Sequence, residues 1–345
     1  MINSHIHIFL EKDIPRGFLP FGLVKILSTK VGYFLLSRIL RNINPFSNKD
    51  EFDRYCQFIK MGKNRTQKEI LDLCVENYPK DTKFIVLPMD MAFMGAGEIS
   101  RSYENQLDEL LALSITNTNV IPFIHIDPRR NKYLSLFYNY IGKGFKGVKL
   151  YPPLGIYPFD MRFSDIYKYC EMNGIPILAH CTAGNPVYFK GSFKELKKLL
   201  ENKNGHYINI DWSKSKRELC SYFTHPDNYR SICETYPNLK ICLAHFGREN
   251  EWDKIIRGMM KIYPNLYADI SYSLYDTEHW GYLKVLLSTD IVFRNKCLFG
   301  SDYYMNIIEG KEKQFSINLR AFLGEELWEQ IAIKNPKKYL GNIKN

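Results

Sequence analysis

Eight short, mostly apolar runs, each followed by a stretch of helical character, set the tightest limit on how this chain can fold. The predicted strands cover residues 1–9, 84–87, 120–126, 145–151, 175–181, 240–245, 266–270 and 297–302. Such runs are typical of a parallel sheet whose two faces are covered by helices. Eight strand–helix units in 345 residues predict an α/β fold, a (β/α)₈ TIM barrel, built as a single domain over residues 1–345.

A doubly wound dinucleotide-binding sheet is the alternative arrangement of the same elements. It would place a glycine-rich phosphate-binding loop directly after the first strand. The residues that follow Phe9 are Leu-Glu-Lys-Asp and contain no glycine. The sequence therefore favours the barrel.

Residues 11–63 separate the first two predicted strands and form a helical insertion. Apolar residues between Phe21 and Ile39 recur at helical spacing, with basic residues largely between them. Such a helix could lie on a membrane surface or cover the mouth of the barrel as a lid. We expect instead that it packs on the body of the barrel. A second helix is predicted over 48–61, and a third begins at a capping box formed by Thr66 and Glu69.

The chain carries a formal net charge of +10, which could reflect an acidic partner. Its basic residues are scattered, however, and they form no run interleaved with aromatic residues that could stack on bases. We therefore expect no nucleic-acid partner. We also expect no membrane association, because charged residues interrupt the longest apolar stretch, at 17–40.

Eight cysteines are present without a C-x-x-C pair, and several of them lie inside apolar runs. This pattern is typical of reduced thiols in an intracellular protein. The first predicted strand begins at residue 2 and leaves no room for a signal peptide. The expected location is the cytoplasm.

His5 and His7 are two positions apart in the first predicted strand and therefore point to the same face. Two imidazoles placed in this way can hold one metal ion. Further ligand-type side chains lie at or near the ends of later strands, namely Lys149, His180, His245 and Asp302. In a barrel the carboxyl ends of all strands meet at one rim, where active sites form. Imidazoles and a carboxylate suit Zn²⁺, and also Mn²⁺ or Fe²⁺.

Seven stretches spread over nearly the whole chain carry a further signal: 5–7 (HIH), 144–153 (GFKGVKLYPP), 177–181 (ILAHC), 236–247 (YPNLKICLAHFG), 266–271 (LYADIS), 298–302 (LFGSD) and 335–341 (NPKKYLG). In this order they resemble the amidohydrolase superfamily, in the branch called amidohydrolase-related. The resemblance implies that His5, His7 and His180 are metal ligands. It implies that Asp302 contacts the metal and its water and acts as general base. It also implies that His245 binds a second ion or polarises the substrate carbonyl.

The number of metal ions, one or two, stays open. Lys149 matches a fourth-strand position that some relatives carboxylate to bridge two ions, whereas other relatives use one ion and no lysine. Asn3 departs from the family pattern, because family members often have an acid two residues before the first ligand. This departure bears on metal affinity rather than on the fold.

Residues near the predicted strand ends are candidates for contact with the substrate. Arg129, Tyr151 and Tyr303 are predicted to bind it, and the guanidinium of Arg129 could pair with a substrate carboxylate. Asp269 and Ser271, after the seventh strand, could lie behind the ligands.

The expected function is hydrolysis of an amide, lactone or ester-type bond of a small-molecule substrate by a metal-activated water. A non-oxidative decarboxylase or hydratase acting on a small carboxylated, often aromatic, compound is the first alternative. A catalytically inactive barrel that docks to a membrane or an acidic partner is the second. Whether the chain forms a homo-oligomer stays open.

Overall fold

The computed structural model describes residues 1–18, 61–63, 65–183, 192–201, 210–219, 221–247, 250–305 and 311–341, and the statements below concern these ranges. Eight parallel strands follow one another in chain order in a single sheet. They are β1 (Ile2–Ile6), β2 (Lys83–Val86), β3 (Val120–His125), β4 (Gly147–Leu150), β5 (Ile177–Ala179), β6 (Ile241–Leu243), β7 (Leu266–Asp269) and β8 (Cys297–Leu298).

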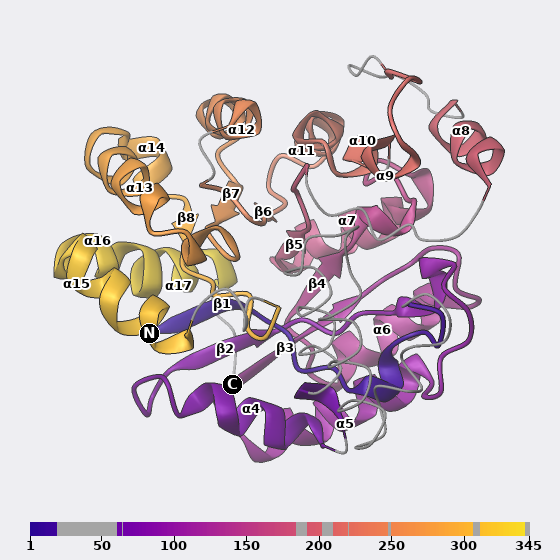
Figure 1. Ribbon diagram of the computed structural model, residues 1–345, viewed down its shortest axis with the longest axis horizontal. Helices are drawn as coiled ribbons and strands as arrows, with labels where there is room; N and C mark the ends of the chain where they lie inside the picture. Colours follow the sequence, from indigo (N-terminus) through magenta and orange to yellow (C-terminus); the bar gives the residue numbers. More distant parts are fainter. Residues whose placement is uncertain are drawn as a thin grey trace, which may run out of the picture.

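Backbone hydrogen bonds join the last strand to the first and close the sheet. The Ser4 amide donates to the Phe299 carbonyl at 2.8 Å, and the Asp302 amide donates to the His5 carbonyl at 2.9 Å. In Figure 1, β1 accordingly lies between β2 and β8. The TIM barrel predicted from the sequence is confirmed.

Helices surround the strands on the outside (Figure 1). They are α4 (Gln67–Val75), α5 (Tyr103–Thr116), α6 (Tyr133–Lys143), α7 (Ser164–Asn173), α8 (Phe193–Glu201), α9 (Lys216–Leu219), α10 (Ser221–Thr224), α11 (Arg230–Thr235), α12 (Glu251–Ile262), α13 (Glu278–Thr289), α14 (Ile291–Arg294), α15 (Leu319–Leu323), α16 (Glu325–Glu329) and α17 (Asn335–Leu340). The capping box predicted before α4 is present. The Thr66 hydroxyl accepts from the Glu69 amide at 3.2 Å, and the Glu69 carboxylate accepts from the Thr66 amide at 2.7 Å.

The C-terminal helices differ from the regular helices predicted over 312–322 and 325–333. They contain two π-helical turns, η8 (Gln314–Asn318) and η9 (Gln330–Lys334). Directly after η9, the side-chain amide of Asn335 donates to the carbonyls of Arg294 and Cys297, both at 2.7 Å. These bonds fix the last helix against the start of β8, and apolar periodicity alone does not reveal them.

Residues alternate along the strands between two hydrophobic layers. In and after β2, Phe84 and Val86 belong to the layer beneath the helices, whereas Ile85 and Leu87 belong to the barrel interior. The interior group from the strands and their ends is Ile2, Ile85, Leu87, Ile121, Phe123, Leu178, Cys242, Ala244, Tyr267 and Leu298. The same alternation continues toward the rim and decides which later side chains point inward.

The described part of the insertion consists of residues 11–18 and 61–63, with a short 3₁₀ helix, η1 (Glu11–Asp13). The helices predicted over 21–39 and 48–61 lie outside the described residues, apart from Met61, so their packing and the lid stay predictions. Over the described ranges, no helix is both long enough and apolar enough to cross a membrane.

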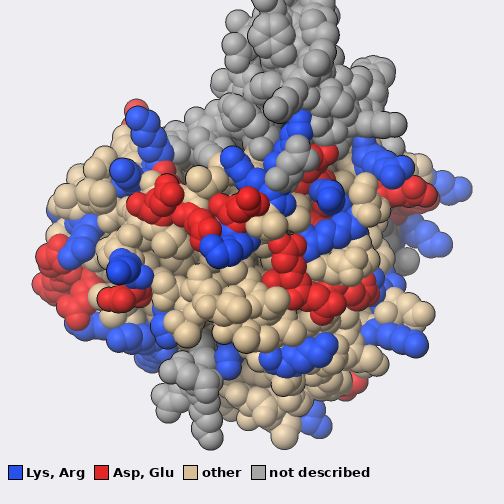
Figure 2. Space-filling model, turned by 90° about the horizontal axis from the view of Figure 1, so that it is seen from below, with Lys and Arg blue, Asp and Glu red and all other residues tan. Residues whose placement is uncertain are grey.

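The surface charges and the cysteines can be located in the structure. Figure 2 shows a face on which basic and acidic side chains are intermingled. Six cysteines are buried free thiols, at positions 74, 170, 181, 233, 242 and 297. Cys56 and Cys220 lie outside the described residues.

Gly147, the first residue of β4, is required by the packing of the barrel interior. A Cβ atom at this position would lie 2.3 Å from the ring of Phe123. That ring is completely buried in the interior layer. Because protein interiors are packed as densely as organic crystals, the ring has little room to move away.

Gly147→Ala is expected to lower the free energy of unfolding by about 1–3 kcal/mol, because the added methyl group overpacks the interior. Chemical denaturation measures this change. Gly142→Ala is the matched control, since Gly142 lies in α6 and no atom lies within 4 Å of its added Cβ. Equal loss of stability in both variants would contradict the packing argument.

Candidate metal centre

Four predicted ligands lie together at the carboxyl-terminal rim of the barrel. His5 lies in β1, whereas His7, His180 and Asp302 lie just beyond the ends of β1, β5 and β8. None of the four is more than 5% exposed. The fold therefore removes these polar side chains from bulk water, and each of them needs a partner.

The regular strands end earlier than the sequence predicted, most clearly in β8. After Leu298 the chain passes so close to β1 that a Cβ atom on Gly300 would lie 2.8 Å from the Cβ of His5. Asp302 follows with a φ of +61°, in the left-handed region. This close approach and turn, rather than a longer strand, bring the Asp302 carboxylate to the histidines.

Three acceptor atoms converge from His5, His7 and Asp302. The Nε2 atoms of the two histidines are 3.3 Å apart. Asp302 Oδ1 lies 3.4 Å from His5 Nε2 and 3.3 Å from His7 Nε2. A tetrahedral zinc ion with bonds of about 2.0–2.1 Å holds its ligand atoms about 3.4 Å apart. The three atoms therefore have the spacing of three corners of a zinc coordination sphere.

Hydrogen bonds on the far side of each imidazole decide which nitrogen carries the proton. His7 Nδ1 must donate to the Leu87 carbonyl, 2.8 Å away, because a carbonyl only accepts. His5 Nδ1 lies 2.9 Å from Asp269 Oδ2, and burial, with Lys149 adding to it, lowers the pKa of His5 well below its usual value. His5 Nε2 therefore carries a lone pair that faces the Asp302 carboxylate and His7 Nε2. This arrangement is unfavourable unless a cation lies between them.

A second set of hydrogen bonds orients His180. His245 Nδ1 donates to the Ser271 carbonyl at 3.2 Å, so His245 Nε2 is an acceptor. That atom lies 3.0 Å from His180 Nδ1, which must be the donor. Burial, and next the neighbouring His245, lowers the pKa of His180 well below its usual value. His180 Nε2 thus carries a lone pair, and it has no hydrogen-bond partner within the described ranges.

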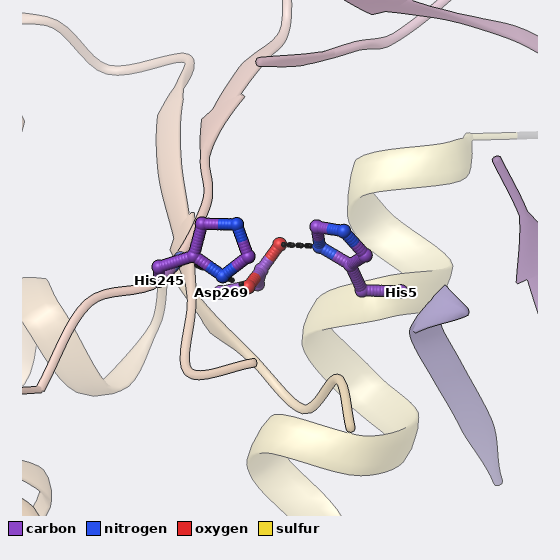
Figure 3. A group of neighbouring side chains, drawn as sticks. All are labelled: His5, His245 and Asp269. Carbon is purple, nitrogen blue, oxygen red and sulfur yellow. Dashed lines mark hydrogen bonds and ion pairs between the residues drawn. The ribbon is translucent and has the colours of Figure 1, made fainter. Parts of the chain in front are cut away.

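Asp269 connects the hydrogen bonds that orient His5 with those that orient His180 and His245. Figure 3 shows its carboxylate between His5 and His245. Its Oδ2 atom accepts from His5, and its Oδ1 atom accepts from the backbone amides of His245 at 3.2 Å and Ser271 at 2.9 Å. Asp269 and Ser271, which from the sequence could lie behind the ligands, do contact His5 and His245 in the structure.

His245 reaches the centre because the backbone breaks the alternation of the strand. Cys242 and Ala244 belong to the interior layer, so a regular strand would turn residue 245 toward the helices. His245 instead has a φ of +70°, a conformation that costs roughly 1–2 kcal/mol in a residue other than glycine. Its ring centroid consequently lies 5.1 Å from that of His5 and 4.6 Å from that of His180.

Lys149 lies beside the three acceptor atoms. It is only 1% exposed, and its Nζ atom is 3.4 Å from His5 Nε2. Burial lowers its pKa to about 8, opposed by the carboxylates of Asp269 and Asp302. The structure brings Lys149 to the centre, and its carboxylation stays a prediction.

Asn3 links the centre to a buried acid that the sequence analysis missed. Its Nδ2 atom donates to the Tyr78 hydroxyl at 2.9 Å and to the Ser301 hydroxyl at 2.8 Å. Tyr78 donates in turn to Glu312 at 2.5 Å. Burial raises the pKa of Glu312 to about 7, against the hydrogen bonds from Ser301 and Tyr78. No motif marks Glu312, because only the folded path of the chain brings it behind the first strand.

The predicted substrate-binding residues occupy different surroundings. Arg129 donates from Nε and Nη2 to the two carboxylate oxygens of Asp127, at 2.9 and 2.6 Å. The Tyr151 ring lies 4.7 Å from that of His180. Tyr303 is buried, and its backbone pairs with β1. Tyr151 is thus well placed beside a candidate ligand, and the substrate-binding roles of all three residues stay predictions.

A family model described as amidohydrolase matches residues 140–341, which is more than half of the chain. The chain belongs to the amidohydrolase family. It is therefore an enzyme of that family, and the resemblance stated from the sequence motifs is confirmed. The matched range contains Lys149, His180, His245 and Asp302, whereas β1 with its two histidines precedes it.

Solved structures with the same fold cover nearly the whole of this amidohydrolase. An uncharacterised TIM-barrel protein from Bordetella bronchiseptica is 15% identical, with a TM-score of 0.59 and coverage of 99% of this chain and 98% of that one. A zinc-bound amidohydrolase from Burkholderia multivorans is 9% identical, with a TM-score of 0.55 and 98% coverage of both chains. A probable 2-pyrone-4,6-dicarboxylic acid hydrolase from Acinetobacter baumannii, with citric acid bound, is 11% identical, with a TM-score of 0.54 and coverage of 99% and 98%. No curated protein matches the chain.

Glu312→Gln is expected to change how the stability of the amidohydrolase depends on pH. The pKa of Glu312 is about 7 in the folded protein, against 4.5 for an ordinary glutamate. Between these values the folded state keeps the proton and the unfolded state releases it. The free energy of unfolding should therefore fall by roughly 3 kcal/mol as the pH rises through this window, and the glutamine variant should lose this decline.

Urea unfolding between pH 4.5 and 8 measures the effect. Glu326→Gln, on an exposed position of α16, is the matched control and should keep the pH dependence of the unchanged protein. If Glu312→Gln also keeps it, Glu312 is ionised in the folded state and the argument from burial is wrong.

Proposed function

We propose that this enzyme is a metal-dependent hydrolase that cleaves an amide, lactone or ester-type bond of a small molecule. The observation that carries the proposal is the set of three potential ligand atoms from His5, His7 and Asp302, which lie 3.3–3.4 Å from one another. The buried, unshared Nε2 atom of His180 supports it. Membership of the amidohydrolase family supports it as well.

One divalent ion is proposed, with His5, His7, His180 and Asp302 as its ligands. Nitrogen ligands and a carboxylate favour zinc, with Mn²⁺ or Fe²⁺ as alternatives. The similar structure from Burkholderia multivorans holds zinc. An ion bound by such ligands lowers the pKa of a water molecule toward about 7 and polarises a substrate carbonyl.

Asp302 is the proposed general base. Its Oδ1 atom faces the two histidines of β1, so we assign the proton transfer to Oδ2. This oxygen would take the proton of the attacking water and then return it to the leaving group. The Asp302 amide donates to the His5 carbonyl at 2.9 Å, so the turn that carries the base is held against β1.

His245 is proposed as a positioning residue for His180. Both of its ring nitrogens are engaged in hydrogen bonds, Nδ1 with Ser271 and Nε2 with His180. It would therefore need to give up the bond to His180 before it could bind a second ion or a substrate carbonyl. For this reason we favour one ion per chain, with Lys149 as an ammonium.

A non-oxidative decarboxylase or hydratase is the alternative, because a one-ion centre without carboxylated Lys149 also suits it. Release of CO₂ from a turned-over substrate would identify a decarboxylase. We do not propose a catalytically inactive barrel, because a residue is present at each of the four proposed ligand positions. The six buried free thiols support a cytoplasmic location for the enzyme.

His180→Ala is expected to remove the metal together with the activity, because it deletes one nitrogen ligand. Inductively coupled plasma mass spectrometry on protein purified without chelator measures the ion content, which should be near one per chain before the change. His279→Ala, in α13, where the imidazole pairs with Asp276 instead of the candidate ligands, is the matched control. Full metal content in His180→Ala would remove His180 from the ligand set. Two ions per unchanged chain would favour carboxylated Lys149.

Asp302→Asn is expected to keep most of the metal and to lower turnover by at least about 100-fold, because the amide cannot take a proton. A panel of lactones, esters and amides would first be screened with the unchanged enzyme. Turnover of the variant would then be measured on a compound that the unchanged enzyme hydrolyses. Asp72→Asn, on an exposed position of α4, controls for the exchange of acid and amide. Undiminished turnover would exclude Asp302 as the base.

A further inference from the structure

His125, the last residue of β3, carries a buried donor that the proposed hydrolysis does not use. Ile121 and Phe123 of the same strand belong to the interior layer, so the alternation points the His125 side chain into the barrel at the rim. The residue is 1% exposed. It therefore lies within the mouth of the barrel rather than beneath the helices.

The hydrogen bonds of His125 determine its proton position. The backbone amide of Asp90 donates to Nδ1 at 2.9 Å, so Nδ1 carries no proton. Burial, with Lys149 next in effect, lowers the pKa of His125 to about 3, so the ring is neutral and its proton is on Nε2. This Nε2–H group is buried and has no hydrogen-bond partner within the described ranges. Buried donors rarely stay unpaired, and an ordered water, an ion or a ligand usually accepts from such a group.

Lys149 is the register partner of His125 on the neighbouring strand. Residues paired in this way on adjacent strands point to the same face. In the described part of the chain, the polar atom within hydrogen-bonding distance of Lys149 Nζ is His5 Nε2, at 3.4 Å. The proposed metal would use that lone pair, so the ammonium of Lys149 would then need another acceptor.

We propose that Lys149 Nζ and His125 Nε2–H together bind a carboxylate group of the substrate beside the metal centre. This inference rests on the proposed function and narrows it to small molecules that carry a carboxylate near the bond that is cleaved. Lys149 Nζ and His125 Nε2 can each donate to one oxygen of a carboxylate, and a hydrogen bond to an ionised acceptor is stronger than one to a neutral amide. Arg129, already held by Asp127, is not needed for this contact.

The test is calorimetric titration of the zinc-loaded enzyme with glutarate and benzoate, and with the neutral glutaramide and benzamide. His125→Asn keeps an acceptor for the Asp90 amide and loses the donor at the Nε2 position, whereas His125→Gln keeps a donor there. We expect at least one of the two carboxylates to bind more than about tenfold tighter than its amide. Its affinity should fall about tenfold in His125→Asn and stay within about threefold in His125→Gln.

Two further measurements keep this inference separate from the hydrolase proposal. Lys149→Met should weaken the same carboxylate at least as much as His125→Asn does, with zinc content unchanged in every variant. Equal affinity in the unchanged enzyme and His125→Asn, with zinc present, would mean that the carboxylate binds only the metal, and would overturn this inference alone. A carboxylated Lys149, seen as added mass on that residue, would also overturn it. A protein that takes up no zinc would overturn both proposals.

Discussion

The ion pair between His5 and Asp269 is the interaction on which the rest of the centre depends. It crosses the barrel from β1 to β7, and neither side chain is exposed to solvent. The carboxylate accepts a hydrogen bond from His5 Nδ1 and so turns the Nε2 lone pair toward the other ligands. It also accepts from the His245 amide, and from the amide and hydroxyl of Ser271. A buried carboxylate is costly unless it is well bonded, and these four donors satisfy that need while holding both halves of the centre in place.

Strand periodicity decides how much of the centre can be predicted from the sequence. His5 and His7 obey it, and the 3.3 Å between their Nε2 atoms confirms that they share a face. Lys149 and His180 follow Gly147 and Leu178 on the inward side, so their direction could also be predicted. The barrel itself could be predicted for the same reason, since alternation and strand–helix rhythm are local properties of the chain.

Other features depend on the folded path of the chain. His245 lies in the centre because of one left-handed residue, and its identification from sequence came from resemblance to a family rather than from alternation. Glu312 lies in the segment that follows β8, and no spacing in the sequence relates it to Asn3 or Tyr78. Many family members have an acid at the position of Asn3, and the nearby Glu312 gives a physical reason for the asparagine here. An acid at position 3 would add a carboxylate next to Tyr78, close to a Glu312 whose pKa is already raised by burial.

The closure of the barrel between β1 and β8 has a consequence for the order of events during synthesis. The hydrogen bond between Asn3 and Ser301 joins residues 298 positions apart. At a translation rate of about 5–20 residues per second, the two histidines of β1 are made roughly 15–60 s before Asp302. Until then β1 lacks its neighbour β8, and the Asp302 carboxylate that completes the three acceptor atoms has not been made. At the proposed site, a metal ion can therefore meet all three atoms only after Asp302 has been made and the ring of strands has closed between β8 and β1.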